Sequence, residues 1–501
     1  MAAAAVALVV RLGYAALGIP EYWGDAYHNW LMSQLTLEHG GVLSDYKGRE
    51  VVWEPLYRYL AVGVTVIVGG ETMLAGRLVS LLSSVTTCGL ITLLVTRLTD
   101  VRWGLAAGLT LALAPWHVAY GWMYMPEATA SLLFVAAVFL VVRGGGPWLV
   151  PVAALGALVR HDVTVLLILT SVWLVMQRRR RDAAWLAVGV VAGLLLWSAW
   201  TWYAAGRPLA WLEQRVAGST ADAAFNTELG ARPAPRPWTV LLMLVQVYAP
   251  LVVLVGAVAV GWRHAAWRTA MHKGSLMWLL LAAFTLILTI MQLKFFSYPD
   301  PRYVVITLPL AVVCSALALR GLPDAWRGRL GIAHALVVAV ALATQIPTFA
   351  FRAWTLSQDR AVGTFLRTNA PMEGRLLVDA PVAIHYSGVP PERFVAWSQL
   401  MAGAPPDMPA PDAMLQALQR EHVALVYAFR ASFTDVPRLI PGLAGDTAFV
   451  GMGLRFEPMY RYVAWTPPAD HRPWWAPIRV RVERGRDGGT VWRVVPEDTN
   501  S

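Results

Sequence analysis

Charged residues are scarce in this chain. Of its 501 residues, 14% are Asp, Glu, Lys or Arg and 57% are hydrophobic, whereas a soluble domain carries roughly 25% charged residues. Apolar runs long enough to cross a hydrocarbon core recur from the N-terminus to about residue 350. The deficit excludes an ordinary soluble protein and predicts an integral membrane protein that crosses the lipid bilayer many times.

Cysteine is almost absent as well. Cys88 and Cys314 each lie in an apolar run, which argues against a disulfide framework and a thiolate metal site. The net charge of +10 comes from short Arg clusters between apolar runs, so nucleic acid is not an expected partner. Met1 to Ile19 lacks the basic start and the cleavage motif of a signal peptide, and we interpret it as an uncleaved first helix.

The apolar segments predict about eleven spans, some of them too short for a straight crossing. They are residues 2–19, 74–95, 103–119, 127–142, 147–159, 163–176, 184–203, 238–261, 276–293, 303–319 and 331–350. Because several segments between residues 103 and 176 are short, we expect kinked or incompletely spanning helices there.

Loop charges predict the orientation in the plasma membrane. The run Arg178 to Arg181 marks a cytoplasmic connection by the positive-inside rule. Alternation then places inside four other basic connections, around residues 97–102, 143, 263–273 and 320–329. The N-terminus is then cytoplasmic, and the loop 20–73, the Arg160-His161-Asp162 turn and the chain after residue 351 are extracytoplasmic.

The predicted fold is mainly α. Residues 1–352 form a polytopic transmembrane helical bundle whose long outer loop, 20–73, carries interfacial helices. From about residue 355 polar residues increase, and the chain shows short β-type runs such as residues 423–429 and helical patterns at residues 359–368 and 411–421. Residues 353–501 therefore predict a small extracytoplasmic α/β domain. This tail has no phosphate-cradling glycine loop and no cluster of metal ligands. We expect it to shape the substrate site or to stabilise the bundle.

Several short motifs follow one another along the chain in a characteristic order. They are Gly24-Asp25-Ala26-Tyr27-His28, Trp53-Glu54-Pro55-Leu56-Tyr57, Ala75-Gly76-Arg77-Leu78-Val79-Ser80, Ala114-Pro115 followed by Met125-Pro126-Glu127-Ala128, Leu158-Val159-Arg160, and Arg302-Tyr303 ahead of Pro309. In order and spacing they resemble the C-type glycosyltransferase (GT-C) superfamily, especially its protein O-mannosyltransferase and lipid A aminoarabinose transferase branches. Ala26 stands where that family has a second acid, and Trp53 where it has His or Glu.

The resemblance implies an inverting membrane glycosyltransferase that uses a polyprenyl-phosphate sugar. The acceptor is a protein, a lipid or a polysaccharide. Such a transfer needs a base for the acceptor hydroxyl and cations for the phosphate. The two departures leave metal dependence open, and a divalent ion at Asp25 and His28 is one alternative.

Each candidate residue also has a simpler interpretation. Asp25 is the expected base, although Asp commonly caps a helix. Glu127 and Glu54 are expected as supporting acids, although an acid at a helix N-terminus is favourable without any chemistry. Arg160, Arg302 and Lys294 are expected to hold the donor phosphate, although long basic side chains also extend to the membrane surface.

Two other classes of protein remain as alternatives. A transporter or lipid flippase would also be polytopic, but such proteins usually contain internal repeats, and we find none here. A non-catalytic membrane scaffold would show no dependence on Asp25.

Overall fold

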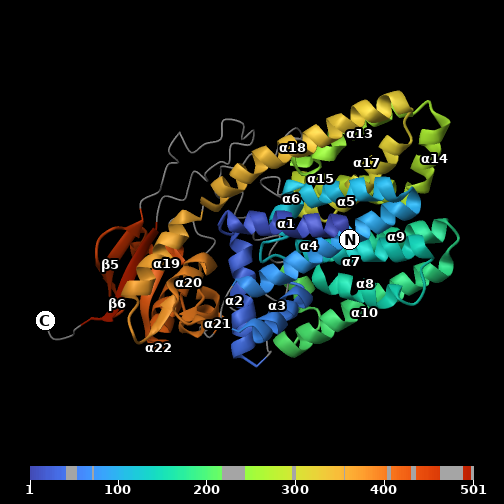
Figure 1. Ribbon diagram of the computed structural model, residues 1–501. Coiled ribbons are helices and arrows are strands. Elements are labelled where there is room, and N and C mark those ends of the chain that lie inside the picture. Colours follow the sequence, from blue (N-terminus) through green and yellow to red (C-terminus); the bar gives the residue numbers. More distant parts are fainter. Residues whose placement is uncertain are drawn as a thin grey trace. The chain divides into compact units, whose positions relative to one another are not determined.

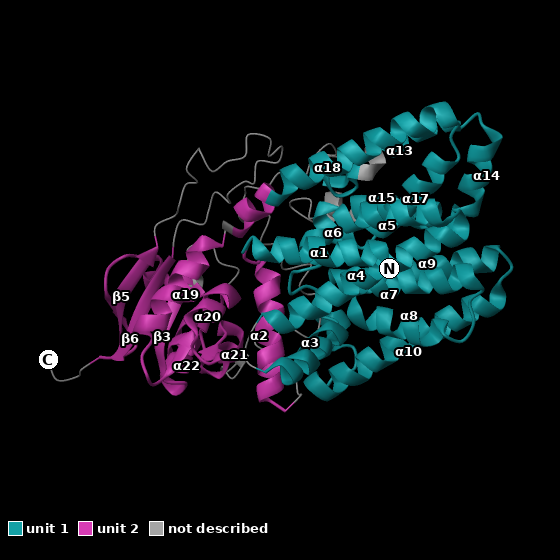
Figure 2. Ribbon diagram, in the orientation of Figure 1, with its two compact units in different colours: residues 1–19, 51–346 teal, residues 20–50, 347–501 magenta. Residues whose placement is uncertain are grey.

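The computed structural model describes residues 1–40, 53–69, 73–216, 243–295, 301–354, 356–402, 408–429, 436–462 and 489–497. The chain forms two compact units (Figure 2). Unit 1 comprises Met1–Ile19 and Val51–Ile346, and unit 2 comprises Pro20–Glu50 and Pro347–Ser501. The C-terminal unit therefore includes the first part of the long loop that follows the first helix.

Unit 1 is a bundle of helices (Figure 1). Its described helices are α1 (Ala2–Ala16), α3 (Pro55–Val68), α4 (Leu74–Leu98), α5 (Val101–Leu113), α6 (Pro115–Tyr120), α7 (Glu127–Arg143), α8 (Leu149–Val159), α9 (His161–Met176), α10 (Arg180–Ala205), α13 (Ala249–Gly261), α14 (Ala265–Lys273), α15 (Ser275–Phe295), α16 (Arg302–Val305), α17 (Leu308–Arg320) and most of α18 (Asp324–Trp354).

Three of the described helices are long and apolar enough to cross a membrane: Leu74–Leu98, Arg180–Ala205 and Asp324–Ala353. A fourth crossing results if Ala265–Lys273 and Ser275–Ile290, which meet at 72°, form one bent span. Six further apolar helices have 10 to 17 residues. Short helices between residues 103 and 176 were expected, and Pro115 divides one of these segments into α5 and α6 because the residue before a proline disfavours helical geometry.

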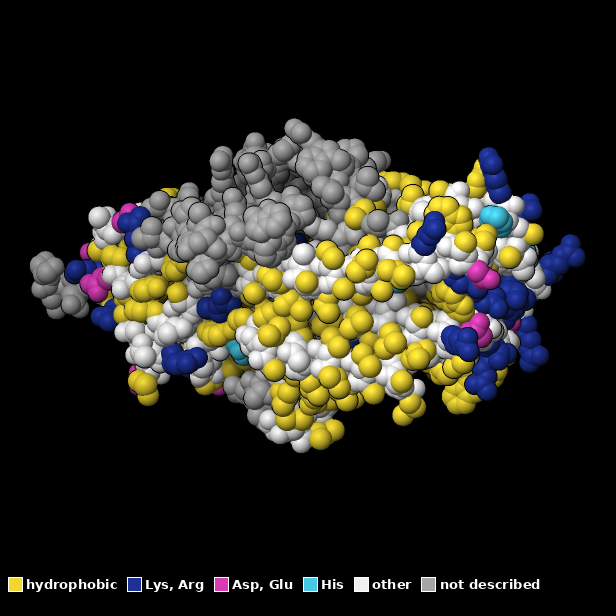
Figure 3. Space-filling model, turned by 45° about the horizontal axis from the view of Figure 1, so that its top comes forward, with side chains coloured by type: hydrophobic (Ala, Val, Ile, Leu, Met, Phe, Trp, Pro, Cys, Tyr) yellow, Lys and Arg dark blue, Asp and Glu magenta, His cyan; other side chains and the backbone are white. Residues whose placement is uncertain are grey.

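Basic side chains gather at one end of unit 1, and apolar side chains cover much of the face of the bundle that is seen in Figure 3. Arg143 at the end of α7 and Arg180 at the start of α10 are exposed. Glu127 begins α7, so it lies at the other end of a helix that is about 25 Å long. The bundle thus separates a basic end from the end that carries Glu127.

Arg11 is a buried cation inside α1. Its Nη1 donates to the carbonyls of Ala7 at 3.0 Å and Ala112 at 3.1 Å, its Nη2 lies 2.6 Å from His117 Nδ1, and its Nε donates to Ser84 Oγ. Ala112 is in the last turn of α5, where carbonyls lack helical partners. Arg11 therefore joins α1 to α4, α5 and α6.

Unit 2 contains a six-stranded sheet in the order β2-β1-β3-β6-β5-β4. Its strands are β1 (Arg375–Leu377), β2 (Phe394–Val395), β3 (Val423–Phe429), β4 (Phe449–Gly451), β5 (Leu454–Tyr462) and β6 (Gly489–Pro496). The first three strands in this order run parallel, with Leu376 opposite Phe394 and Leu425, and the remaining neighbours are antiparallel. The α/β character expected for the tail is confirmed.

Helices complete unit 2. They are α2 (Gly24–Glu38), α19 (Ser357–Asn369), α20 (Pro381–Ser387), the 3-10 helix η2 (Pro391–Arg393), α21 (Trp397–Ala402), α22 (Ala410–Arg420), α23 (Val436–Leu439) and the 3-10 helix η3 (Pro441–Ala444). The main core of the sheet packs Met414 and Leu418 of α22 against Val426, Phe456 and Trp492. Apolar burial of this kind is the principal stabilising contribution.

Candidate functional site

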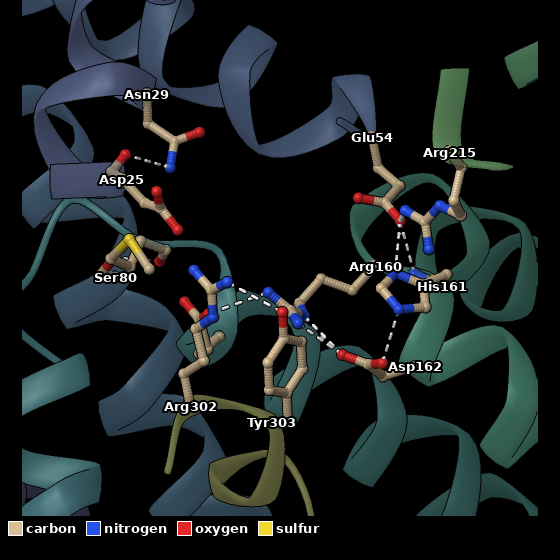
Figure 4. Close-up of polar contacts among 12 residues, drawn as sticks. Asp25, Asn29, Glu54, Ser80, Arg160, His161, Asp162, Arg215, Arg302 and Tyr303 are labelled. Carbon is tan, nitrogen blue, oxygen red and sulfur yellow. Dashed lines mark hydrogen bonds and ion pairs between the residues drawn. The ribbon is translucent and has the colours of Figure 1, made fainter. Parts of the chain in front are cut away.

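A buried ionic cluster surrounds Arg160, which pairs with carboxylates from two helices (Figure 4). Arg160 Nη1 donates to Glu127 Oε1 at 2.9 Å, and Arg160 Nε and Nη2 donate to Asp162 Oδ2 at 3.0 and 2.6 Å. Glu127 is fully buried, and Arg160 and Asp162 are less than one-tenth exposed. Two carboxylates thus fix the plane of one guanidinium, a geometry that bidentate Arg pairs favour.

Local backbone geometry creates this arrangement. Arg160 is the extended residue, φ −164° and ψ 137°, between α8 and α9, and Asp162 lies in the first turn of α9. Glu127 lies in the first turn of α7. Both acids therefore stand at the positive ends of helix dipoles, where negative charge is favourable.

Glu54 connects this cluster to the start of α3. Its Oε1 accepts from the backbone N of His161 at 2.7 Å, and it lies 3.1 Å from His161 Nδ1 and 3.5 Å from Arg215 Nη2. Burial opposes the ionisation of Glu54, but the hydrogen bonds from His161 and the charges of His161, Arg215 and Arg160 hold its pKa below the ordinary value. Glu54 is therefore a carboxylate at neutral pH.

Two guanidinium groups lie over the ring of Tyr303. The Cζ atom of Arg302 is 4.8 Å from the centre of the Tyr303 ring and that of Arg160 is 5.8 Å from it, both within cation–π range. Arg302 Nη2 also donates to the Tyr303 hydroxyl at 2.9 Å. The ring thus places the two predicted phosphate ligands on one side of unit 1.

The motifs of α3 and α4 lie beside the loop that leads into Glu127. Tyr57 donates to the carbonyl of Gly76 at 3.0 Å, and Ser80 Oγ donates to the carbonyl of Met125 at 3.0 Å. A Cβ atom on Gly76 would fall 2.5 Å from the Tyr124 ring, so glycine is required for this close packing. These contacts set the position at which α7 begins.

Asp25 and His28 lie on α2, in unit 2. The N-cap position of α2 is Trp23, with no side-chain cap, and Asp25 follows in the first turn. Asn29 Nδ2 donates to the Asp25 carbonyl at 3.0 Å, and His28 is buried. Asp25 therefore does not occupy the capping position considered from the sequence.

The structure brings together three of the predicted residues, Glu54, Glu127 and Arg160, and joins Arg302 to them through Tyr303. The side chain of Lys294 lies outside the described residues. Sequence reasoning did not identify Asp162, His161, Arg215 or Tyr303 as members of the site. The sequence contains one signal for His161 and Asp162. The run Arg160-His161-Asp162 places three consecutive ionisable residues between two apolar helices, where charge is costly at membrane depth.

The described residues offer no obvious metal centre. Among them, no three His, Cys, Asp or Glu side chains come together in a way that could hold an ion. Asp25 and His28 supply only two such groups, one turn apart on α2.

The fold of the whole chain matches solved structures of membrane-bound transferases at low sequence identity. Over 97% of this chain and 96% of the other, the fold matches ArnT from Cupriavidus metallidurans bound to undecaprenyl phosphate, with a TM-score of 0.55 and 13% identity. The oligosaccharyltransferase of Archaeoglobus fulgidus in the apo form matches over 88% of this chain and 71% of that chain, with a TM-score of 0.52 and 12% identity.

A second structure of that oligosaccharyltransferase, in complex with Zn and sulfate, matches over 87% of this chain and 69% of that chain, with a TM-score of 0.50 and 14% identity. No family model matches the sequence, and a search of curated proteins finds no match. Because the sequence identities are only 12–14%, the likeness establishes the fold alone. The chain is a polytopic membrane protein with the GT-C fold.

Proposed function

We propose that this protein is a membrane glycosyltransferase that moves a sugar from a polyprenyl-phosphate carrier to an acceptor hydroxyl at the extracytoplasmic face. The observation that carries the proposal is the end-to-end likeness of the fold to ArnT bound to undecaprenyl phosphate. The buried ionic cluster at one end of the bundle supports it, because ionisable residues at membrane depth are rarely retained without a role. The basic opposite end supports an extracytoplasmic position for the cluster, because the positive-inside rule favours basic residues on the cytoplasmic side.

In this proposal, Arg302 and Arg160 hold the donor phosphate, with Lys294 as a third ligand. A guanidinium remains charged near lipid and matches two phosphate oxygens at once. Glu127 and Asp162 orient Arg160, so the phosphate meets a cation whose geometry is already set. Glu54 keeps the α8–α9 turn in place through His161.

The reaction is a single displacement. The acceptor hydroxyl oxygen forms a bond to the anomeric carbon, the bond from that carbon to the phosphate oxygen breaks, and the polyprenyl phosphate leaves with the electron pair. Attack from the opposite face inverts the anomeric configuration. Asp25 takes the hydroxyl proton as the general base.

Mass spectrometry of glycans and glycolipids from cells with and without the gene tests the function. A sugar that disappears from one acceptor identifies both substrates, and unchanged profiles under conditions of normal expression would contradict the proposal. Asp25→Asn should then fail to restore the sugar, because the amide cannot accept the proton. Asp412→Asn, the same change in α22, is the matched control and should restore it.

A further inference from the structure

The helix that carries Asp25 is held by aromatic residues of the C-terminal domain, and both belong to unit 2. The Tyr27 and Tyr386 hydroxyls lie 3.2 Å apart, within hydrogen-bond distance. The His385 ring lies 5.2 Å from the Tyr27 ring and meets the Trp30 ring edge-on at 4.6 Å. These four residues, which we call the aromatic clamp, join α2 to α20 across more than 350 positions of the chain.

The two clamp residues on α2, Tyr27 and Trp30, are buried. Tyr27 is 1% exposed and Trp30 is 3% exposed, and every residue of α2 from Ala26 to Thr36 is buried. Aromatic pairs in tilted or edge-to-face geometry are favourable beyond the area they bury.

The position of α20 is itself fixed by α19. A Cβ atom on Gly363 would fall 2.6 Å from the Ala383 carbonyl oxygen and 2.7 Å from Tyr386 Cβ, so α19 and α20 touch through bare backbone. Arg367 Nη2 of α19 donates to the Tyr386 carbonyl at 2.7 Å. The clamp is therefore anchored to the domain rather than to a free loop.

The segment ahead of α2 has a second attachment. Tyr22 stacks on Phe349 at 5.2 Å with the rings 5° from parallel, and the Arg352 guanidinium lies 5.7 Å from the Trp23 ring centre. Phe349 and Arg352 belong to the last turns of α18. Asp25 thus stands between two aromatic attachments, one before it at Tyr22 and Trp23 and one after it at Tyr27 and Trp30.

We propose that His385 and Tyr386 are positioning residues for Asp25, so that the C-terminal domain sets the place of the catalytic base. The inference rests on the proposed function for the role of Asp25. Tyr27 follows Asp25 by two residues, less than one helical turn, so a shift at Tyr27 moves the Asp25 carboxylate with it. Displacement of a reacting group by about 1 Å can cost on the order of a hundredfold in rate.

The need for a clamp follows from the helix itself. Helix α2 has 15 residues, starts with Gly24 and lacks a side-chain N-cap. An isolated helix of about this length is marginal in water. Its first turn, where Asp25 lies, is the part most prone to fray, and the aromatic contacts stabilise that turn.

The test uses the full-length protein in detergent with three substitutions. His385→Ala removes both ring contacts, Tyr386→Phe removes only the hydroxyl, and His385→Phe restores a ring. Tyr460→Phe is the matched control, because Tyr460 lies on β5 and stacks on Phe365 of α19 rather than on α2. Hydrogen–deuterium exchange of the peptide 24–38 reports on the clamp without any substrate.

His385→Ala should raise exchange of residues 24–38 by roughly three- to tenfold, in keeping with the loss of aromatic pairs. Exchange in β3 and β6 should stay unchanged, and Tyr460→Phe should behave as wild type. Tyr386→Phe should have a smaller effect, and His385→Phe should restore protection. Unchanged exchange of residues 24–38 in His385→Ala would overturn the clamp.

Transfer activity then tests the positioning role, measured as restoration of the sugar that is lost from cells without the gene. His385→Ala should lower transfer roughly ten- to a hundredfold, and His385→Phe should recover it. If His385→Ala raised the exchange of residues 24–38 but kept full transfer, the positioning role would be wrong. If Asp25→Asn also retained full transfer, the failure would lie with the assignment of the base, whereas loss in Asp25→Asn alone would place it with the clamp.

Discussion

Glu54 Oε1 accepts a hydrogen bond from the backbone N of His161 at 2.7 Å and lies 3.1 Å from Nδ1 of the same residue. The two residues are 107 positions apart, and the contact joins the entry of α3 to the start of α9. The first backbone N–H groups of a helix lack internal partners. Glu54 therefore caps α9 from a distant part of the chain and, at the same time, holds the turn that carries Arg160.

This contact predicts a specific pH dependence. Because the folded state lowers the pKa of Glu54 below the ordinary value of 4.5, the charge of Glu54 contributes stability that is fully present above that value. The contribution is lost as the pH falls through the lowered pKa of the folded state. The difference in melting temperature between wild type and Glu54→Gln in detergent should be largest near pH 5, where His161 is also charged, and should shrink under more acidic conditions. A difference that kept growing below pH 5 would contradict the assignment.

The pair of Glu127 and Arg160 predicts a large effect on stability. Glu127→Ala should destabilise the protein by about 1–3 kcal/mol, because it leaves buried Arg160 Nη1 without its acceptor while Asp162 still pairs with the guanidinium. Glu127→Gln should cost less, since it keeps an oxygen for Arg160 Nη1. Chemical denaturation in detergent measures both.

Glu213→Ala is the control for that experiment. Glu213 pairs with Arg207 at 2.7 Å, but both side chains are more than half exposed. An exposed pair contributes about 0–1 kcal/mol. Equal costs for Glu127→Ala and Glu213→Ala would show that the buried cluster is not a stabilising network.

The sequence predicts the fold where local signals are strong. The segment Val423 to Phe429 was expected as a strand and forms β3 with the same bounds. Residues 359–368 and 411–421 were expected as helices and fall in α19 and α22. The strands β4 and β6 were not foreseen, because β4 has three residues and β6 has glycine and proline at its ends. Pairing with β5 stabilises both.

The site was predictable in its residue types and not in its contacts. Arg160 and Glu127 were selected from motif order, but their ion pair spans 33 positions and depends on how α7 and α8 pack. The attachment of α2 to α20 was not foreseen at all, since neither Tyr27 nor His385 carries a pattern that specifies a partner in another segment. Such contacts result from packing rather than from local propensity.

Tyr303 offers a test of the proposed phosphate site. Tyr303→Phe removes the hydroxyl that accepts from Arg302 at 2.9 Å but keeps the ring under both guanidinium groups. The loss of a hydrogen bond to a charged group should weaken donor binding by roughly tenfold, seen as a higher KM for the polyprenyl-phosphate sugar with little change in kcat. Arg302→Ala should cost more than Tyr303→Phe.

Tyr203→Phe is the matched control for the phosphate site, because Tyr203 is an exposed tyrosine on α10. It should leave the KM for the donor at the wild-type value. If Tyr303→Phe and Arg302→Ala both behaved like Tyr203→Phe, these residues would not contact the donor.

Arg11 predicts a structural cost at the start of the bundle. Arg11→Met fills a similar volume but leaves the Ala112 carbonyl, Ser84 Oγ and His117 Nδ1 without their donor. A buried polar group without its partner costs about 1–3 kcal/mol, and the cation at the end of α5 is itself favourable. Thermal denaturation in detergent should therefore show a clearly lower melting temperature for Arg11→Met. Arg97→Met, the same change at an exposed position of α4, should melt as wild type does, and equal melting temperatures for the two variants would exclude this role for Arg11.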